Sequence, residues 1–214
     1  MAIKDESNLK TSVFRADSRI DSLNMQFTRT DIPDVVLIEP VVHGDDRGYF
    51  AETYRKDESE AFLGFTVAFC QDNESKSARA VLRGLHFQLP PFAQTKLVRV
   101  IQGAVLDVAV DIRRGSPTFG RYVAVELSGE NKKQLLVPRG FAHGFLVLTD
   151  ETIFSYKVDN YYSRESERGV AFDDPDIGID WHWPQEALLL SEKDRKQPRL
   201  KDAKELFDFD AKYY

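Results

Sequence analysis

The feature that most constrains the fold is a series of short runs rich in β-branched and aromatic residues, separated by Gly, Pro, Asp and Asn. Such runs indicate strands, and we expect strands at 35–38, 49–54, 67–70, 81–88, 97–101, 105–112, 122–127, 134–137 and 152–158. Strands of this length and spacing are typical of a β-sandwich or a small barrel. Gly103 and Gly129 each follow one of these runs and predict hairpin turns.

Helical signal is scarce by comparison. Residues 56–63 predict a short helix, because Asp57 and Glu58 would form an acidic first turn, and residues 191–195 predict a single helical turn. We therefore expect an all-β protein with a few short peripheral helices. Its functional side chains should lie on strands and on the loops that join them.

Composition narrows the classes of function. The 214 residues, 42% of them hydrophobic, are enough for one domain with a single core. The net charge of −6 argues against nucleic-acid binding through a general field, although a local basic pocket could still bind a phosphorylated ligand. Cys70 is the only cysteine, so an internal disulfide and a zinc site built from cysteines are excluded. With no apolar run near the roughly 20 residues of a membrane span, we expect a soluble, cytoplasmic protein.

The run at 81–88 is unusual because it sets charged and titratable groups inside an apolar strand. Side chains of a regular strand alternate between two faces, which would put Arg83 on one face and His86 on the other. Both residue types are poor choices for ordinary core. A pocket lined with polar groups explains them better.

A second histidine belongs to a recognisable barrel pattern. The segment PRGFAHG at 138–144 matches the PxGxxH pattern of cupin barrels and places His143 at the start of a strand. A metal-binding cupin would also carry two histidines two residues apart and then an acidic residue. Here His86 is followed by Gln88, and Thr95 and Lys96 stand where the acid is expected. A cation among missing ligands disfavours a divalent metal, so we predict a cupin-type barrel without metal or cofactor.

Between about residues 27 and 195 the chain resembles the dTDP-4-dehydrorhamnose 3,5-epimerase family of cupin-fold enzymes. The resemblance rests on the order and spacing of motifs at 44–52 (GDDRGYFAE), 71–77 (QDNESKS), 82–88 (LRGLHFQ), 109–113 (AVDIR), 116–120 (SPTFG), 138–145 (PRGFAHGF), 156–157 (YK), 160–163 (NYYS) and 190–194 (LSEKD). It implies a double-stranded β-helix, or jelly roll, spanning 27–196. An extension at 1–26, flexible or associated with an interface, and a tail at 197–214 with no assignable role flank this domain.

The resemblance also implies three catalytic positions. His86 corresponds to the base that removes a proton next to the sugar's C4 ketone, where conjugation makes the C–H bond acidic. Asp194 corresponds to the carboxylate that orients this histidine, and Tyr156 to the acid that returns a proton on the opposite face. Taken alone, Asp194 would read as a solvated charge and Tyr156 as a packed strand residue. Lys96 is the candidate for stabilising the enolate oxygen, or else a salt-bridge partner on the barrel wall.

Further positions correspond to substrate contacts in the family. Cations suit a diphosphate, and an aromatic ring suits stacking on a base. The cations are Arg47, Arg83 and Lys96, the stacking ring is Tyr162, and the remaining positions are Glu52, Gln71, Asp72, Asn73, His143, Glu167 and Lys193. His143 could equally be a structural remnant of the cupin pattern. Since both Arg83 and His86 should reach the substrate, we expect either a bulge or twist at Gly84 or a neighbouring subunit that makes use of the face carrying Arg83.

Members of this family pair strands between subunits, which implies a homodimer whose 47–52 hairpin completes the neighbour's site. The expected reaction is epimerisation at C3 and C5 of dTDP-4-dehydro-6-deoxy-D-glucose to give dTDP-4-dehydro-L-rhamnose. The alternatives are an epimerase acting at C3 or C5 alone on a related dTDP-4-keto-6-deoxysugar, a metal-dependent cupin, and a non-catalytic sugar-nucleotide binder. Presence of both His86 and Tyr156 favours the double epimerase.

Overall fold

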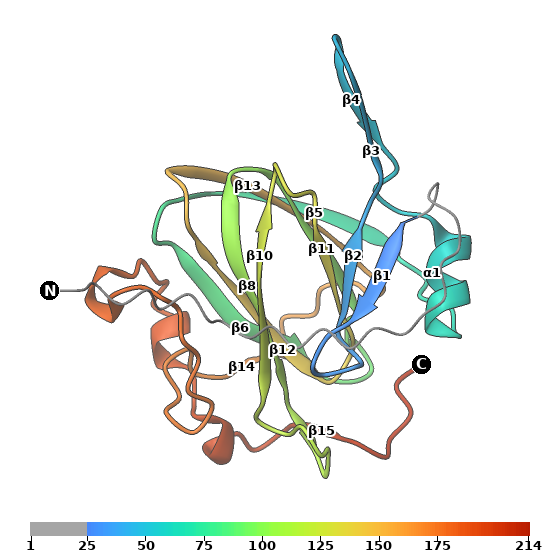
Figure 1. The fold of residues 1–214 in the computed structure, drawn as a ribbon. Helices are drawn as coiled ribbons and strands as arrows, with labels where there is room; N and C mark the ends of the chain where they lie inside the picture. The colour runs from blue at the N-terminus through green and yellow to red at the C-terminus, as the bar shows by residue number, and fades with distance from the viewer. Residues whose placement is uncertain (1–24) are drawn as a thin grey trace, which may run out of the picture.

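The computed structural model describes residues 25–214. The predicted extension at 1–26 therefore lies outside the described residues, apart from its last two positions. The chain forms two large antiparallel sheets that face each other (Figure 1). The first has the order β1 (Gln26–Arg29), β2 (Val36–Glu39), β11 (Gln134–Val137), β7 (Lys96–Gln102), β13 (Glu151–Val158) and β5 (Gln71–Ala78). The second has the order β10 (Tyr122–Ser128), β8 (Ala104–Asp111), β12 (Phe141–Val147), β6 (Leu82–Gln88) and β14 (Glu167–Gly169). This arrangement confirms the predicted all-β jelly roll.

Smaller elements surround the two sheets. A separate hairpin pairs β3 (Val42–Asp45) with β4 (Gly48–Ala51), and a two-stranded parallel ladder joins β9 (Arg113–Arg114) to β15 (Phe207–Asp208). The predicted helix is confirmed as α1 (Lys56–Leu63). Three 3-10 helices follow late in the chain, η1 (Gln185–Ala187), η2 (Asp194–Lys196) and η3 (Leu200–Asp202). Of the helices in residues 25–214, none combines the length and the apolar character needed to cross a bilayer.

Hydrophobic residues pack in three layers. The middle layer lies between the sheets, where Val98 and Phe154 of the first sheet meet Ala109 and Phe145 of the second. The outer face of the second sheet is covered by the segment that runs from 170 to 207, and α1 covers part of the first. Strands β8 and β12 are consequently buried on both faces. This explains why their sequences read as continuous apolar runs without alternation.

Two sequence predictions about these strands were wrong. No strand forms at 67–70; the strand instead begins at Gln71 and continues through a polar stretch to Ala78. This strand, β5, is at the edge of its sheet and half of its side chains are exposed, so it has no need of apolar residues. Gly103 and Gly129 do lie at turns, but each turn joins strands of different sheets and is not a hairpin. Adjacent strands in sequence therefore cross between layers, as a jelly roll requires.

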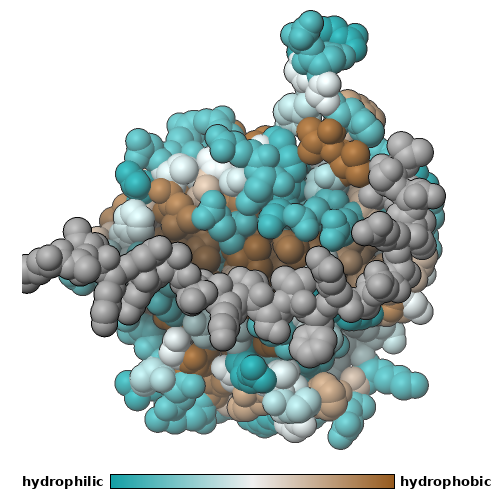
Figure 2. Space-filling view, viewed as in Figure 1, coloured by the Kyte–Doolittle hydropathy of each residue, from teal (hydrophilic) through white to brown (hydrophobic). Residues whose placement is uncertain are grey.

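The hairpin of β3 and β4 projects away from the barrel, and its outer end is hydrophilic (Figures 1 and 2). Its aromatic residues Tyr49 and Phe50 are 62% and 65% exposed. Near the tip Arg47 forms an ion pair with Asp45. Large aromatic side chains exposed on a projecting hairpin are a common mark of a surface that binds another protein.

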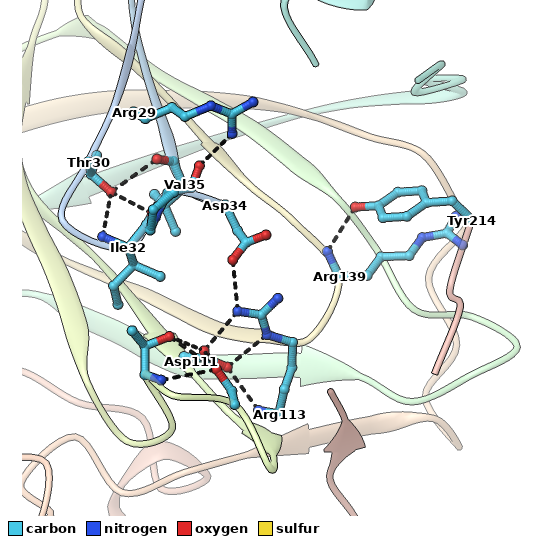
Figure 3. Close-up of polar contacts among 12 residues, drawn as sticks. Arg29, Thr30, Ile32, Asp34, Val35, Asp111, Arg113, Arg139 and Tyr214 are labelled. Carbon is cyan, nitrogen blue, oxygen red and sulfur yellow. Dashed lines mark hydrogen bonds and ion pairs between the residues drawn. The ribbon is translucent and has the colours of Figure 1, made fainter. Parts of the chain in front are cut away.

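The C-terminal residues pack against the barrel. Phe207 is 2% exposed within the core, and β15 pairs with β9. At the end of the chain the Tyr214 hydroxyl lies 2.7 Å from Thr95 Oγ1 and accepts a hydrogen bond from the Arg139 amide (Figure 3). The tail at 197–214, for which the sequence indicated no role, thus covers one end of the barrel.

A buried ion pair anchors the end of β8. The Asp111 carboxylate, with no exposed surface, accepts hydrogen bonds from Arg113 Nε at 2.9 Å and Nη2 at 2.8 Å, and from the hydroxyls of Ser116 and Thr118 at 2.6 Å each (Figure 3). Burial by itself raises the pKa of Asp111, but these donors outweigh it and hold the pKa below its usual value. Arg113 also pairs with Asp34 at 3.0 Å.

Replacing Asp111 by Ala is expected to lower the free energy of unfolding by about 3–5 kcal/mol, because it leaves the Arg113 charge buried without its main partner. For a domain of this size the midpoint of thermal unfolding should fall by about 10 °C, measured by calorimetry. The control is Asp34→Ala, whose half-exposed ion pair should contribute less than about 1 kcal/mol. Equal unfolding midpoints for the parent and Asp111→Ala would contradict this assignment.

Candidate active site

A cavity of about 510 Å³ opens between the two sheets. Its walls come from both sheets and from the segment that follows η1. The lining residues are Ser75, Val81, Leu82, Arg83, His86, Lys96, His143, Phe145, Phe154, Tyr156, Leu189, Leu190, Ser191, Lys193 and Asp194. A volume of this size suits a small organic ligand. Seven of the residues predicted as site residues are thereby brought together: His86, Tyr156, Asp194, Arg83, Lys96, His143 and Lys193.

The expected bulge in β6 is confirmed. His86 lies opposite His143 of β12, and Arg83 lies opposite Phe145, so three steps along β6 match two steps along β12. The extra residue reverses the alternation and lets both Arg83 and His86 line the cavity. Gly84 adopts φ +132°, and a Cβ atom there would lie 2.5 Å from the Gly144 Cα. Only glycine fits this close approach of the two strands.

His86 and Asp194 form a hydrogen-bonded pair. Nε2 of His86 lies 2.5 Å from Oδ1 of Asp194, and Asp194 is 5% exposed. Burial raises the pKa of Asp194, but the His86 ring and the Ser191 hydroxyl outweigh burial and keep the pKa below its usual value. The carboxylate is therefore ionised at neutral pH and fixes the ring orientation. Nδ1 of His86 has no hydrogen bond within residues 25–214, which leaves one ring nitrogen free to accept a proton.

A second histidine–carboxylate pair lies on the same wall. Nε2 of His143 is 3.0 Å from both carboxylate oxygens of Asp107, which has no exposed surface. Sequence reasoning missed Asp107. The sequence feature that could have revealed Asp107 is its place as a lone acidic residue within the apolar run of β8, where burying an unpaired carboxylate would be costly. His143 is thus held in place by β8 and faces the cavity.

Lys96 points into the cavity from β7 and forms no salt bridge in the described part of the chain. Burial lowers its pKa to about 8, although the negative charges of Asp107 and Glu167 act in the opposite direction. At neutral pH the ammonium group is therefore still mostly protonated. An ammonium group that has no counter-ion among residues 25–214 and lines the same cavity as His86 is suited to stabilising negative charge that develops on a ligand.

Tyr156 approaches from the opposite wall. It belongs to β13 in the first sheet, whereas His86 belongs to β6 in the second. Burial raises the pKa of Tyr156, with a smaller opposing effect from the charge of Arg83. The phenol therefore stays protonated at neutral pH and can act as a proton donor. Between these two walls, a base and an acid can act on opposite faces of one ligand.

The rim of the cavity is organised around Glu167 of β14. Its carboxylate pairs with Lys193 Nζ at 2.5 Å and accepts a hydrogen bond from the Tyr162 hydroxyl at 2.9 Å. Burial raises the pKa of Glu167, but Lys193 and Tyr162 outweigh it and lower the pKa below its usual value. The exposed ring of Tyr162 is thus tethered beside the cavity entrance.

The other predicted site residues lie outside the cavity of this chain. Gln71 and Asn73 share the inward side of β5 with Ser75, whereas Asp72 lies on the other side and pairs with Lys157 at 2.8 Å. Arg47 and Glu52 lie on the projecting hairpin and on the residues that follow it. Besides Asp107, sequence reasoning missed Ser75, Ser77, Phe145, Phe154 and Ser191. Of these, Ser77 accepts a hydrogen bond from Arg83 Nε at 3.1 Å.

The positions where a metal cupin carries its ligands serve other purposes here. The side-chain amide of Gln88 donates hydrogen bonds to the carbonyls of Phe92 and Tyr161 and accepts one from the backbone amide of Ser163. These bonds fix the loop after β6. Thr95 is fully buried against Tyr214. Within residues 25–214, His, Cys, Asp and Glu form no group of three that could hold a metal ion. The metal-free barrel stays a prediction.

Comparisons with known proteins agree with this geometry. The family model for dTDP-4-dehydrorhamnose 3,5-epimerase matches residues 29–202. The dTDP-4-dehydrorhamnose 3,5-epimerase of Pseudomonas aeruginosa is 54% identical over 84% of this chain and 98% of its own length. A solved epimerase from Legionella pneumophila, in complex with dTDP-4-keto-L-rhamnose, superposes with a TM-score of 0.84 at 47% identity, covering 88% of this chain and all of the other.

A solved 3'-monoepimerase from Streptomyces bikiniensis, in complex with dTDP-quinovose, is more distant. It has a TM-score of 0.73 and 34% identity, and the match covers 84% of this chain and 88% of that one. Both the family model and the relatives at about 50% identity thus carry the same description, and the chain belongs to the dTDP-4-dehydrorhamnose 3,5-epimerase family.

Proposed function

We propose that this chain inverts C3 and C5 of dTDP-4-dehydro-6-deoxy-D-glucose, yielding dTDP-4-dehydro-L-rhamnose. The observation that carries the proposal is the opposition of His86, oriented by a carboxylate, and Tyr156, a protonated phenol, across one cavity. The same cavity holds Lys96, whose ammonium group has no ion-pair partner within residues 25–214. The relatives at about 50% identity support the same activity.

Each inversion requires one proton to leave and another to arrive. Nδ1 of His86 takes the proton from the carbon next to the C4 ketone. The electron pair of that C–H bond forms a carbon–carbon double bond to C4, and the π pair of the carbonyl moves to the ketone oxygen to give an enolate. Lys96 stabilises the oxygen charge. The Tyr156 hydroxyl then delivers a proton to the opposite face of the same carbon, and the ketone re-forms. His86 and Tyr156 return to their starting states through solvent, so no redox cofactor is consumed.

The nucleotide end of the substrate calls for cations and a flat surface. Arg83 and Lys193 border the cavity, and both have donors that match diphosphate oxygens. The tethered ring of Tyr162 offers a surface on which the base can stack. Gln71 and Asn73 lie on the inward side of β5 and extend the polar wall. A cytoplasmic location fits the single, exposed Cys70 thiol.

The experiment that tests this proposal is turnover of dTDP-4-dehydro-6-deoxyglucose coupled to a reductase that accepts only the doubly epimerised ketosugar. Oxidation of the nicotinamide cofactor should then depend on the concentration of this protein. Absence of any coupled signal, with a known epimerase active in the same assay, would overturn the proposal. Epimerisation at one carbon only would produce an altered sugar without the coupled signal.

Replacing Tyr156 by Phe is expected to slow inversion strongly while leaving some proton exchange. The base can still remove a proton and return it to the same face, but the opposite face lacks its donor. We expect the rate of product formation to fall about 10²- to 10⁴-fold, measured by the coupled assay, while solvent deuterium still enters the unconverted substrate. The control Tyr122→Phe, outside the cavity, should behave like the parent. Inversion at the parent's rate in Tyr156→Phe would assign the acid elsewhere.

We also propose a homodimer in which the projecting hairpin brings Arg47 and Glu52 to the partner's cavity. The exposed Tyr49 and Phe50 and the projection of the hairpin away from its own barrel (Figure 1) support this arrangement. The expected result comes from coexpressing two inactive variants, Arg47→Ala and His86→Ala. If each hairpin serves the other subunit, a mixed dimer has one intact site, so about a quarter of all sites should be active. A hairpin that serves its own subunit would leave every site defective and the mixture inactive.

A further inference from the structure

Ser191 makes two hydrogen bonds to Asp194. Its hydroxyl donates to Asp194 Oδ2 at 2.8 Å and accepts the Asp194 amide at 3.1 Å. The other carboxylate oxygen, Oδ1, faces His86. Both oxygens of a carboxylate that is 5% exposed are thus engaged, one by the base and one by this serine. The rotation of the Asp194 side chain is fixed as a result.

The turn that carries this pair is fastened to the strand that carries His86. The amide of Leu82, at the start of β6, donates to the Leu189 carbonyl at 3.0 Å, and the Leu189 amide donates to the Ala80 carbonyl at 2.9 Å. Two residues later Ser191 opens the turn, and its carbonyl accepts the Arg195 amide at 3.1 Å. Ser191 therefore lies between η2 and a segment that is hydrogen bonded to the start of β6. In this place it can hold Asp194 at a fixed position relative to β6.

We propose that Ser191 is a positioning residue for proton abstraction, acting through Asp194 on His86. The role rests on the proposed function, since it presupposes that His86 is the base. Without the hydroxyl, Oδ2 of a carboxylate that is 5% exposed loses its donor, and the carboxylate is free to turn away from the His86 ring. A ring released from its orienting carboxylate presents Nδ1 to the substrate in the wrong geometry for part of the time.

The test uses three variants at this position and one elsewhere. Ser191→Ala should lower kcat about 10- to 100-fold with KM changed less than about threefold, because binding groups are untouched while alignment of the base is lost. Ser191→Thr keeps a hydroxyl and should retain kcat within about threefold of the parent. Ser191→Cys keeps the shape of serine but has only a weak donor, so it should resemble Ser191→Ala and serves in its place should the alanine variant not fold.

The matched control is Ser128→Ala. Ser128 is 8% exposed and its hydroxyl accepts the amide of Asn131, three residues later, at 2.9 Å, as Ser191 does with Asp194. It lies at the end of β10, away from the cavity, so its loss should reduce stability and leave kcat at the parent's value. Parent-like kcat in Ser191→Ala or Ser191→Cys, or an equal loss in Ser191→Thr, would overturn the proposal.

A substrate-free measurement separates this inference from the proposed function. In ¹⁵N-histidine NMR the Nε2–H proton of His86, assigned with His86→Ala, should resonate far downfield in the parent and in Ser191→Thr because of its bond to Asp194. It should move upfield or broaden in Ser191→Ala and in Ser191→Cys. Should the parent fail to turn over the sugar, the proposed function fails, and this signal still decides whether Ser191 positions the pair: an unchanged resonance in both variants contradicts it.

Discussion

Replacing His86 by Asn is expected to lower kcat about 10²- to 10⁴-fold, the range that loss of a general base produces. Asparagine has a similar shape and can still hydrogen bond with Asp194, but it cannot accept the substrate proton. The fold should survive, because His86 lies on the cavity wall and not in the apolar core. The coupled assay measures the loss, and exchange of substrate protons with solvent should fall in parallel.

The matched control for this variant is His182→Asn. His182 is an exposed histidine with φ +52°, a conformation that asparagine tolerates well, and it pairs with Asp180 outside the cavity. Its activity should equal that of the parent. Full activity in His86→Asn would mean that another group removes the proton, and His143 with its buried partner Asp107 would be the next candidate.

Replacing Lys96 by Met is expected to lower kcat about 10²- to 10³-fold, the cost of removing a group that stabilises an oxyanion. The same variant should be more stable than the parent at neutral pH. Burial, with no salt bridge among residues 25–214, lowers the pKa of Lys96 to about 8, so keeping it protonated in the folded state at neutral pH costs about 3 kcal/mol. Methionine fills the same space without that cost. Activity and thermal unfolding together check the prediction.

The pH dependence of the parent follows from the same lysine. Its pKa is 10.5 when unfolded and about 8 when folded, so between these values the unfolded chain binds more protons. Stability contributed by this group therefore rises as pH increases from about 8 to 10.5, while activity falls above about pH 8 as the ammonium group is lost. Lys96→Met should lack both trends, and Lys157→Met, on a lysine paired with Asp72, should keep them. An activity that stays constant to pH 10 would contradict the role given to Lys96.

Much of the fold could be predicted from the sequence, because the central strands are buried on both faces and are therefore rich in β-branched residues. The edge strand β5 could not, since one side faces a polar cavity and the other faces solvent. The Gly103 and Gly129 turns were placed in the right positions but given the wrong partners. Whether a turn returns to the same sheet depends on packing between layers, which local sequence does not encode.

The candidate site could likewise be predicted only in part from the sequence. The resemblance to a family supplied His86, Tyr156 and Asp194, and the structure brings them around one cavity. Asp107 and Ser191 emerged only from the structure, because their partners His143 and Asp194 become neighbours through folding or through a specific turn. Arg47 shows the opposite case: a family motif assigns it to the substrate, yet among the described residues of one chain its side chain pairs with Asp45 alone.

The proposed function requires one cavity to carry out two inversions. The most direct test is NMR of dTDP-4-dehydro-6-deoxyglucose incubated with the protein in deuterium oxide. We expect deuterium at both C3 and C5 of a product with the L-rhamno configuration, and no such product with His86→Asn. Label entering at one carbon alone would establish a single-site epimerase, and a substrate that keeps both protons would contradict the account.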